Sequence, residues 1–190
     1  MNARLAMEAE SVRRTLARST RASLRRAAPD GRAYEVLFDV RTVVRGKDRV
    51  IREEARRVPV LYELAPDHPH RPPLVIAGQA DLFNVHIHDP FDGCDLPPLA
   101  FVCLGSFSPG MTIADWIVST YRVLAWARIA AAQPFSHEAA VWARQQMGEG
   151  RFPIDRRGFF ESGTPSPTQQ APQSEGASRR QLRLRSRSEA

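Results

Sequence analysis

Two stretches of alternating apolar and polar residues, separated by a short polar turn, restrict this chain to folds that contain an antiparallel sheet. The first stretch, residues 34–44, begins Tyr-Glu-Val-Leu-Phe-Asp-Val. Apolar residues at every second position are typical of a strand with one buried face. The second stretch, residues 50–64, places Val58 and Val60 on one face, and Gly-Lys-Asp at 46–48 forms the turn. Because a tight turn joins neighbouring antiparallel strands, we predict an antiparallel meander.

The segment that follows is rich in proline, which excludes a helix. Residues 65–73 read Ala-Pro-Asp-His-Pro-His-Arg-Pro-Pro. Proline has no backbone N–H to donate, and its ring clashes with the preceding helical turn, so it is confined to loops and sheet edges. We therefore predict a rigid extended loop at 65–73 and a short third strand at 74–76.

Helical spacing of apolar residues predicts three helices, and together with the strands they predict an α+β fold. Residues 2–28 place leucine and valine near one stripe among many arginines, which predicts a basic amphipathic helix that ends at Pro-Asp-Gly, 29–31. Residues 112–129 repeat apolar side chains at intervals of three and four. Residues 136–147 form the third predicted helix, with Ser136 as its N-cap.

Length and composition favour one domain followed by a tail. The chain has 190 residues, 43% of them hydrophobic, which is enough for one packed core. We place the domain at 1–150. Proline, serine, glutamine and arginine dominate the tail at 151–190, which we predict to be disordered. No apolar run is long enough to cross a bilayer and no secretory signal is evident, so we expect no membrane partner.

Net charge and cysteine content limit the reactions and the cell compartment that we expect for this protein. The net charge of +6 comes almost wholly from arginine, and Lys47 is the single lysine. A GC-rich genome would explain this bias. The handling of activated acyl groups would explain it too, because arginine stays protonated whereas a lysine amine can attack. The 2 cysteines, Cys94 and Cys103, are too few for a secreted disulfide framework, so we expect a cytoplasmic protein.

Cys103 is the residue that most directly suggests chemistry. It lies at the end of the apolar run Phe-Val-Cys-Leu, 101–104, and the start signal of a helix follows at 108–113. A thiol placed between a short apolar segment and a loop can be held at a surface, which suits a carrier that accepts an acyl group on sulfur. A cysteine in this position can instead be buried and inert. We expect Cys94, in a loop of aspartate and glycine, to be exposed and dispensable.

Four short motifs occur in the same order as in the ubiquitin-conjugating enzyme family. His-Pro-His-Arg-Pro-Pro at 68–73 resembles the family's Tyr-Pro-Phe-x-Pro-Pro, and Val-Cys-Leu at 102–104 resembles its Ile-Cys-Leu. Phe-Ser-Pro-Gly-Met-Thr-Ile at 107–113 is similar to Trp-Ser-Pro-x-x-Thr-Ile, and Pro-Phe-Ser-His-Glu-Ala-Ala at 134–140 is similar to Pro-Leu-x-x-Glu-Ala-Ala. The resemblance covers residues 1–147. It implies a UBC-like fold with an N-terminal helix, an antiparallel β-meander and C-terminal helices.

The resemblance implies that Cys103 carries a thioester. The family's His-Pro-Asn tripeptide is not intact, because Leu-Phe-Asn-Val at 82–85 keeps only Asn84. We predict Cys103, Asn84 and His86 as catalytic residues, with the amide of Asn84 donating a hydrogen bond to the developing oxyanion. His86 or His88 would serve instead as the donor or as a general base. Asn84 could also simply hold a turn through its side chain.

The resemblance also implies the partners of a divergent bacterial conjugation pathway. These are a ubiquitin-like protein, an activating enzyme that contacts the basic helix 2–28, and a ligase or substrate protein that contacts the loops at 68–73 and 106–109. We expect no cofactor and no metal. The basic helix and the arginine-rich tail lack interleaved aromatic residues or a nucleic-acid motif, so we expect no specific nucleic-acid partner.

Two other classes of protein remain open from the sequence. The incomplete tripeptide would suit a catalytically inactive adaptor of the same fold. A zinc-binding or nucleic-acid-binding module is the second alternative, although the spacing of the residues that could bind zinc matches no zinc signature. Those residues are His68, His70, His86, His88, Cys94 and Cys103.

Overall fold

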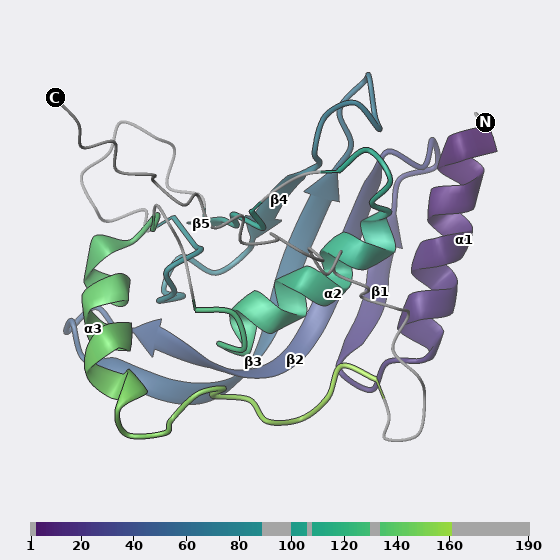
Figure 1. Cartoon of the computed structure of the whole chain (residues 1–190). Coiled ribbons are helices and arrows are strands. Elements are labelled where there is room, and N and C mark those ends of the chain that lie inside the picture. The colour runs from purple at the N-terminus through teal and green to yellow at the C-terminus, as the bar shows by residue number, and fades with distance from the viewer. Residues whose placement is uncertain (1–2, 89–99, 106–107, 130–133, 161–190) are drawn as a thin grey trace, which may run out of the picture.

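The computed structural model describes residues 3–88, 100–105, 108–129 and 134–160 of the chain (Figure 1). The described part is an α+β domain with an N-terminal helix, an antiparallel sheet and C-terminal helices, as predicted. The helices are α1 (Ala3–Ala17), α2 (Ile113–Leu124) and α3 (His137–Met147). The strands are β1 (Ala22–Ala27), β2 (Ala33–Arg45), β3 (Ile51–Glu63), β4 (Leu74–Ala77) and β5 (Ala100–Phe101). None of the described helices is long and apolar enough to cross a bilayer.

The 5-stranded sheet has the order β1-β2-β3-β4-β5, and each neighbouring pair is antiparallel. The predicted meander is therefore confirmed. Strands β2 and β3 pair along their whole length, from Ala33 opposite Glu63 to Arg45 opposite Ile51. In Figure 1, α2 lies across one face of this sheet, α1 lies beside β1, and α3 lies at the far end of the long β2–β3 hairpin.

The core forms where the alternating residues of the sheet meet the helices. Val36, Phe38 and Val60 are fully buried, and they belong to one apolar cluster with Val12 of α1 and Ile117 of α2. Burying each such side chain contributes about 1.5–3 kcal/mol. A second cluster joins α3 to the end of α2 and to the segment that follows β4; its buried members are Val43, Phe83, Val85, Trp126, Ala139, Ala143 and Ile154.

Two helix starts follow directly from local side-chain chemistry. The predicted N-cap of α3 is confirmed, since the Ser136 hydroxyl accepts a hydrogen bond from the backbone N–H of Ala139 at 3.1 Å. Helix α2 begins with a capping box, in which Thr112 accepts from the N–H of Asp115 and Asp115 accepts from the N–H of Thr112. Both caps satisfy backbone donors that a helix start leaves without intrahelical partners.

The predicted helix over 2–28 is wrong in its second half. Helix α1 ends at Ala17, and Ala22–Ala27 form β1, which pairs with β2. Arginine, alanine and leucine are good helix formers, so local propensity favoured a helix throughout. Pairing with β2 overrides that propensity, and it leaves Leu24 exposed on the sheet instead of buried on a helix stripe.

Helix α2 ends at Leu124 rather than at the predicted residue 129. Trp126 has a φ of 56°, in the left-handed region, which interrupts the helix. Its indole is fully buried and stacks on Phe152, with ring centroids 5.3 Å apart. Packing of this one tryptophan in the second cluster therefore turns the chain out of the helix.

The packed part of the chain extends past residue 150, where we predicted the domain to end. Phe159 is buried in the main core and lies against Tyr121, with ring centroids 5.3 Å apart. The carboxylate of Asp155 accepts a hydrogen bond from the backbone N–H of Arg41 at 2.8 Å, which ties this segment to β2. The rest of the predicted disordered tail, from residue 161, lies outside the described residues.

A buried carboxylate joins α1 to the proline-rich loop and to α2. Glu8 is 1% exposed, and one of its oxygens accepts the backbone N–H of Ile113 at 2.8 Å. The other oxygen accepts from Nε2 of His68 at 3.1 Å and lies 2.8 Å from the Arg4 guanidinium. The loop at 65–73 is thus fixed to the helical layer through His68.

Candidate active site

The segment 81–88 follows β4 in the chain. In space it lies between the end of β2 and β5, and backbone hydrogen bonds fix it at both of its ends. Near β2, the backbone N–H of Phe83 donates to the carbonyl of Val43 at 3.0 Å. Near β5, the N–H of His88 donates to the carbonyl of Phe101 at 2.9 Å. The segment that carries the predicted Asn84 and His86 therefore lies beside the short strand that leads to Cys103.

Cys103 is the second residue after β5 and lies next to His86. Its backbone N–H donates to the carbonyl of His86 at 2.7 Å. Its neighbours Val102 and Leu104 are buried, whereas Cys103 is half-buried and its thiol is free. Because alternate side chains of an extended stretch face opposite sides, Val102 and Leu104 fill the core while Cys103 faces away from it. The thiol is therefore neither sealed in the core nor blocked by a disulfide.

The side chain of Asn84 is engaged with the backbone. It is 1% exposed, its Nδ2 donates to the carbonyl of Val123 at 2.8 Å, and its Oδ1 accepts the N–H of His86 at 2.9 Å. These contacts fix a turn and attach it to the end of α2, the alternative that we kept open for this residue. Direct contact with a reacting acyl group would require this buried amide to exchange partners.

His86 is buried and uncharged near neutral pH. It is 4% exposed. Burial, and next the nearby positive charge of Arg128, lower the pKa of His86 to about 4. An imidazole with this pKa is a weak general base, but in its neutral form one ring nitrogen still donates a hydrogen bond. Among the described residues, Nε2 of His86 has no hydrogen-bond partner.

His88 has different surroundings from His86. The N–H of Ile87 donates to the carbonyl of Asn84 at 3.1 Å, and this turn breaks the extended alternation. The His88 ring lies edge-on to Phe101 and Phe135, at centroid distances of 6.5 and 6.4 Å. Neither of its ring nitrogens has a hydrogen-bond partner among the residues that the structure describes.

Arg128 lies at this site, and the sequence analysis missed it. Its Nη1 donates to the carbonyl of Leu104, the residue after Cys103, at 2.6 Å. The guanidinium lies against Gly105, which has a φ of 79°. A glycine shortly after the cysteine was a visible sign of a close approach. No spacing pattern linked it to an arginine beyond the end of α2.

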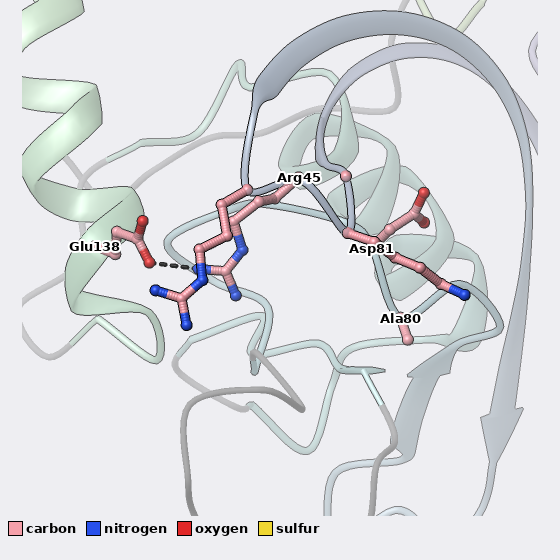
Figure 2. Close-up of a pocket in the computed structure, with 7 residues that line it drawn as sticks. Arg45, Ala80, Asp81 and Glu138 are labelled. Atoms are coloured by element: carbon pink, nitrogen blue, oxygen red, sulfur yellow. Dashed lines mark hydrogen bonds and ion pairs between the residues drawn. The ribbon is translucent and has the colours of Figure 1, made fainter.

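A pocket of about 710 Å³ lies elsewhere, at the turn between β2 and β3 (Figure 2). Figure 2 shows Glu138 of α3 directed at Arg45, with which it forms an ion pair. The other acid of the pocket, Asp81, pairs with Arg56 at 3.1 Å. The residues that line the pocket are Arg45, Gly46, Lys47, Arg49, Ala80, Asp81 and Glu138. Because this set contains none of the predicted catalytic residues, the pocket is separate from the thiol site.

Several predicted features fall outside the described residues. Cys94 is one of them, as are Ser106 of the predicted partner loop at 106–109 and Phe107 of the third motif. Within the described ranges, no group of three or more histidine, cysteine, aspartate or glutamate side chains is arranged to hold a metal ion. His68, one of the residues that we considered for zinc, uses its Nε2 to bind Glu8.

Comparison with known proteins assigns no family to the chain. No protein-family model matches it, and no curated protein matches it. The fold class therefore follows from the structure itself, and any function has to be argued from the residues around Cys103.

Proposed function

We propose that this protein has a UBC-like fold and is a conjugating enzyme of a ubiquitin-like pathway. It accepts the C-terminal acyl group of a ubiquitin-like protein on the sulfur of Cys103 and transfers this group to an amine. One observation carries the proposal: the thiol is free and partly exposed at the end of β5, bonded through its backbone to the segment that contains Asn84 and His86. The four motifs that resemble the ubiquitin-conjugating enzymes support the same assignment.

Two balanced acyl transfers make up the reaction. The Cys103 thiolate attacks the carbonyl carbon of a thioester on the activating enzyme; a new C–S bond forms, the old C–S bond breaks, and the activating enzyme's sulfur leaves and takes up the proton. An amine then attacks the new thioester, the C–N bond forms and the C–S bond to Cys103 breaks. The amine's proton is released to solvent or to the departing thiolate. No cofactor takes part, because the donor thioester already supplies the free energy.

His86 and Asn84 have different roles in this proposal. Each transfer passes through a tetrahedral intermediate whose oxygen becomes negative, and a nearby hydrogen-bond donor stabilises it. Neutral His86 offers such a donor, since its backbone binds that of Cys103 and its Nε2 has no partner among the described residues. This nitrogen is buried, so in this proposal it has to become accessible to the acyl oxygen as the intermediate forms. Asn84 acts indirectly, because its amide holds the turn that places His86.

The proposal assigns two partner surfaces, α1 and the proline-rich loop. The activating enzyme contacts α1, the part of the predicted region 2–28 that is helical, where Arg13 and Arg14 are exposed. A ligase or substrate protein contacts the loop at 65–73, where His70 and Arg71 are exposed. The Glu8 contacts hold these two surfaces in a defined relation to each other.

The test is to incubate the protein with ATP, an activating enzyme and the ubiquitin-like protein that this enzyme activates. We expect an adduct that thiols cleave, that persists in Cys94→Ser and that is absent in Cys103→Ala. Formation of the same adduct by Cys103→Ala would place the acyl group on another residue and overturn the assignment.

An inactive adaptor of the same fold is the second candidate, and one observation favours it. The Asn84 amide is buried and both of its polar atoms are hydrogen-bonded to backbone groups, so this chain lacks an exposed asparagine at the position that the family uses. An adaptor would bind the ubiquitin-like protein without forming the adduct. Binding in the absence of an adduct, with an activating enzyme shown to be loaded, would therefore replace the enzyme by the adaptor.

A further inference from the structure

We propose that Arg128 is the positioning residue of the thiol site, and that its guanidinium gives the surface next to Cys103 a preference for negatively charged reactants. What this means for catalysis rests on the proposed function. The placement of the positive charge does not, because it follows from two contacts of Arg128, with Leu104 and Gly105. Its electrostatic effect on His86 supports the same placement.

The first contact fixes the backbone that follows the thiol. Nη1 of Arg128 donates to the carbonyl of Leu104 at 2.6 Å. A hydrogen bond from a charged donor is about twice as strong as one between neutral groups. Arg128 therefore holds the residue next to Cys103 in place and brings a permanent positive charge to it.

The second contact shows that the chain is shaped to accommodate the guanidinium. A Cβ added to Gly105 would lie 2.3 Å from Nη2 of Arg128, which is far inside van der Waals contact, and the φ of 79° is one that side chains disfavour. Any residue other than glycine would displace the arginine. Gly105 is also exposed, so the missing side chain leaves Nη2 close to the protein surface.

The third observation is electrostatic and concerns His86, which lies on the amide side of Cys103. The charge of Arg128 is one of the causes that lower the pKa of His86, so the guanidinium lies within electrostatic reach of that imidazole. The carbonyl of His86 in turn accepts the N–H of Cys103. Cys103 therefore lies between His86, on its amide side, and the residue that Arg128 binds, on its carbonyl side.

Arg128 provides stabilisation of negative charge near the thiol, which Asn84 does not provide. The amide of Asn84 is buried and bound to the backbone, so it is poorly placed to stabilise an oxyanion. A fixed cation beside the thiol stabilises negative charge as it develops on the acyl oxygen, without any rearrangement during the reaction. Arg128 acts through the loop that it holds and through its charge, while His86 provides the direct donor.

The experiment compares two alkylating agents that differ in charge, using the full chain with Cys94→Ser. The reaction rate of Cys103 is measured with anionic iodoacetate and with neutral iodoacetamide. Replacing Arg128→Gln should lower the ratio of the two rates by about three- to tenfold, since a positive charge within several ångströms of a partly exposed group attracts an anion by this much. High salt should reduce the same ratio in the parent protein.

Matched variants separate charge from folding. Arg144→Gln removes an exposed charge on α3 and should leave the ratio unchanged, whereas Arg128→Lys should retain most of it. If Arg128→Gln does not fold, Gly105→Ala displaces the guanidinium and should lower the ratio in the same direction. An NMR titration of His86 should also show its pKa rising in Arg128→Gln, because a nearby positive charge is removed.

Different results would overturn the role of Arg128 and the proposed function. An unchanged rate ratio in folded Arg128→Gln, or an equal loss in Arg144→Gln, would overturn the role of Arg128 whatever the protein does. A lowered ratio in a protein that forms no thioester adduct would leave the charge assignment intact and remove only its catalytic meaning.

Discussion

The buried carboxylates of this protein differ sharply from its buried imidazoles. Glu8 and Asp155 each use both oxygens in hydrogen bonds, and each joins two or more elements of the fold. His86 and His88 are equally buried, yet they retain ring nitrogens without partners among the described residues. Satisfied buried polar groups stabilise a fold, whereas an unsatisfied one requires another explanation. These two imidazoles lie on the segment next to Cys103, whereas a third buried imidazole, that of His68, binds Glu8 through Nε2 and leaves only Nδ1 without a partner among the described residues.

The largest expected effect is at the better-satisfied carboxylate. Glu8→Ala leaves Arg4, His68 and the N–H of Ile113 without their shared partner, so we expect a loss of about 3–5 kcal/mol in the free energy of unfolding. Urea denaturation measures it. Glu10→Ala removes an exposed carboxylate from the same helix and should cost about 0.5 kcal/mol or less. Equal losses in both variants would mean that Glu8 is not the joint that we describe.

For the buried imidazoles, the lowered pKa of His86 predicts that the folded protein loses stability in acid. The pKa of His86 is lowered to about 4 in the folded protein, whereas an unfolded histidine has an ordinary pKa of about 6.5. The unfolded chain therefore binds the proton first, and stability is lost as the pH falls from 6.5 towards 4. The pKa difference corresponds to about 3 kcal/mol at pH 4. Denaturation curves of His86→Gln should show a weaker pH dependence in this window, and an unchanged one would exclude His86 as the cause.

Asp155 predicts a smaller effect at lower pH. Burial alone would raise the pKa of Asp155, but hydrogen bonds from Arg157 and from the N–H of Arg41 outweigh burial and lower the pKa. Its stabilising effect is therefore present above the ordinary aspartate pKa of about 3.9 and is lost as the pH falls below that value. Asp155→Ala should cost about 2 kcal/mol at pH 7. Thermal unfolding with Asp39→Ala as the exposed control would reveal any general effect of lost charge.

The smallest expected effect on stability is that of removing the Cys103 thiol, and it is compared with truncation of the neighbouring core residue. Cys103→Ala should change the free energy of unfolding by less than about 1 kcal/mol, because the side chain faces away from the core. Val102→Ala should cost about 2 kcal/mol, since it leaves a cavity among buried side chains. A cost at Cys103 as large as that at Val102 would mean that the thiol is packing material.

Local patterns in the sequence predicted the parts of the fold that depend on local chemistry. The meander followed from a period of two, and the start of α3 followed from Ser136, because strand alternation and helix caps involve neighbouring residues. Strand β1 and the end of α2 could not be predicted in this way. They depend on pairing with β2 and on the burial of Trp126 against Phe152, which bring together residues far apart in the chain.

The same distinction between local patterns and long-range packing applies to the candidate site. Cys103 was predicted from a short motif, Asn84 from what remains of the family's tripeptide, and His86 from the acid–base chemistry of histidine. The structure brings their segments together through backbone hydrogen bonds. The motifs did not distinguish a free amide from one bound to the backbone, nor a general base from a neutral donor. Those distinctions depend on burial and on Arg128, whose place beside Gly105 is set by tertiary packing.

The most direct measurement is the rate at which Cys103 takes up an acyl group in the folded and in the unfolded protein. A synthetic peptide thioester serves as the donor, Cys94→Ser leaves one thiol, and mass spectrometry follows the acylated chain with and without urea. A reactive carrier should be acylated faster when folded, because the site stabilises the oxyanion. Slower acylation in the folded state would show that the fold shields this sulfur, and it would contradict the proposed function.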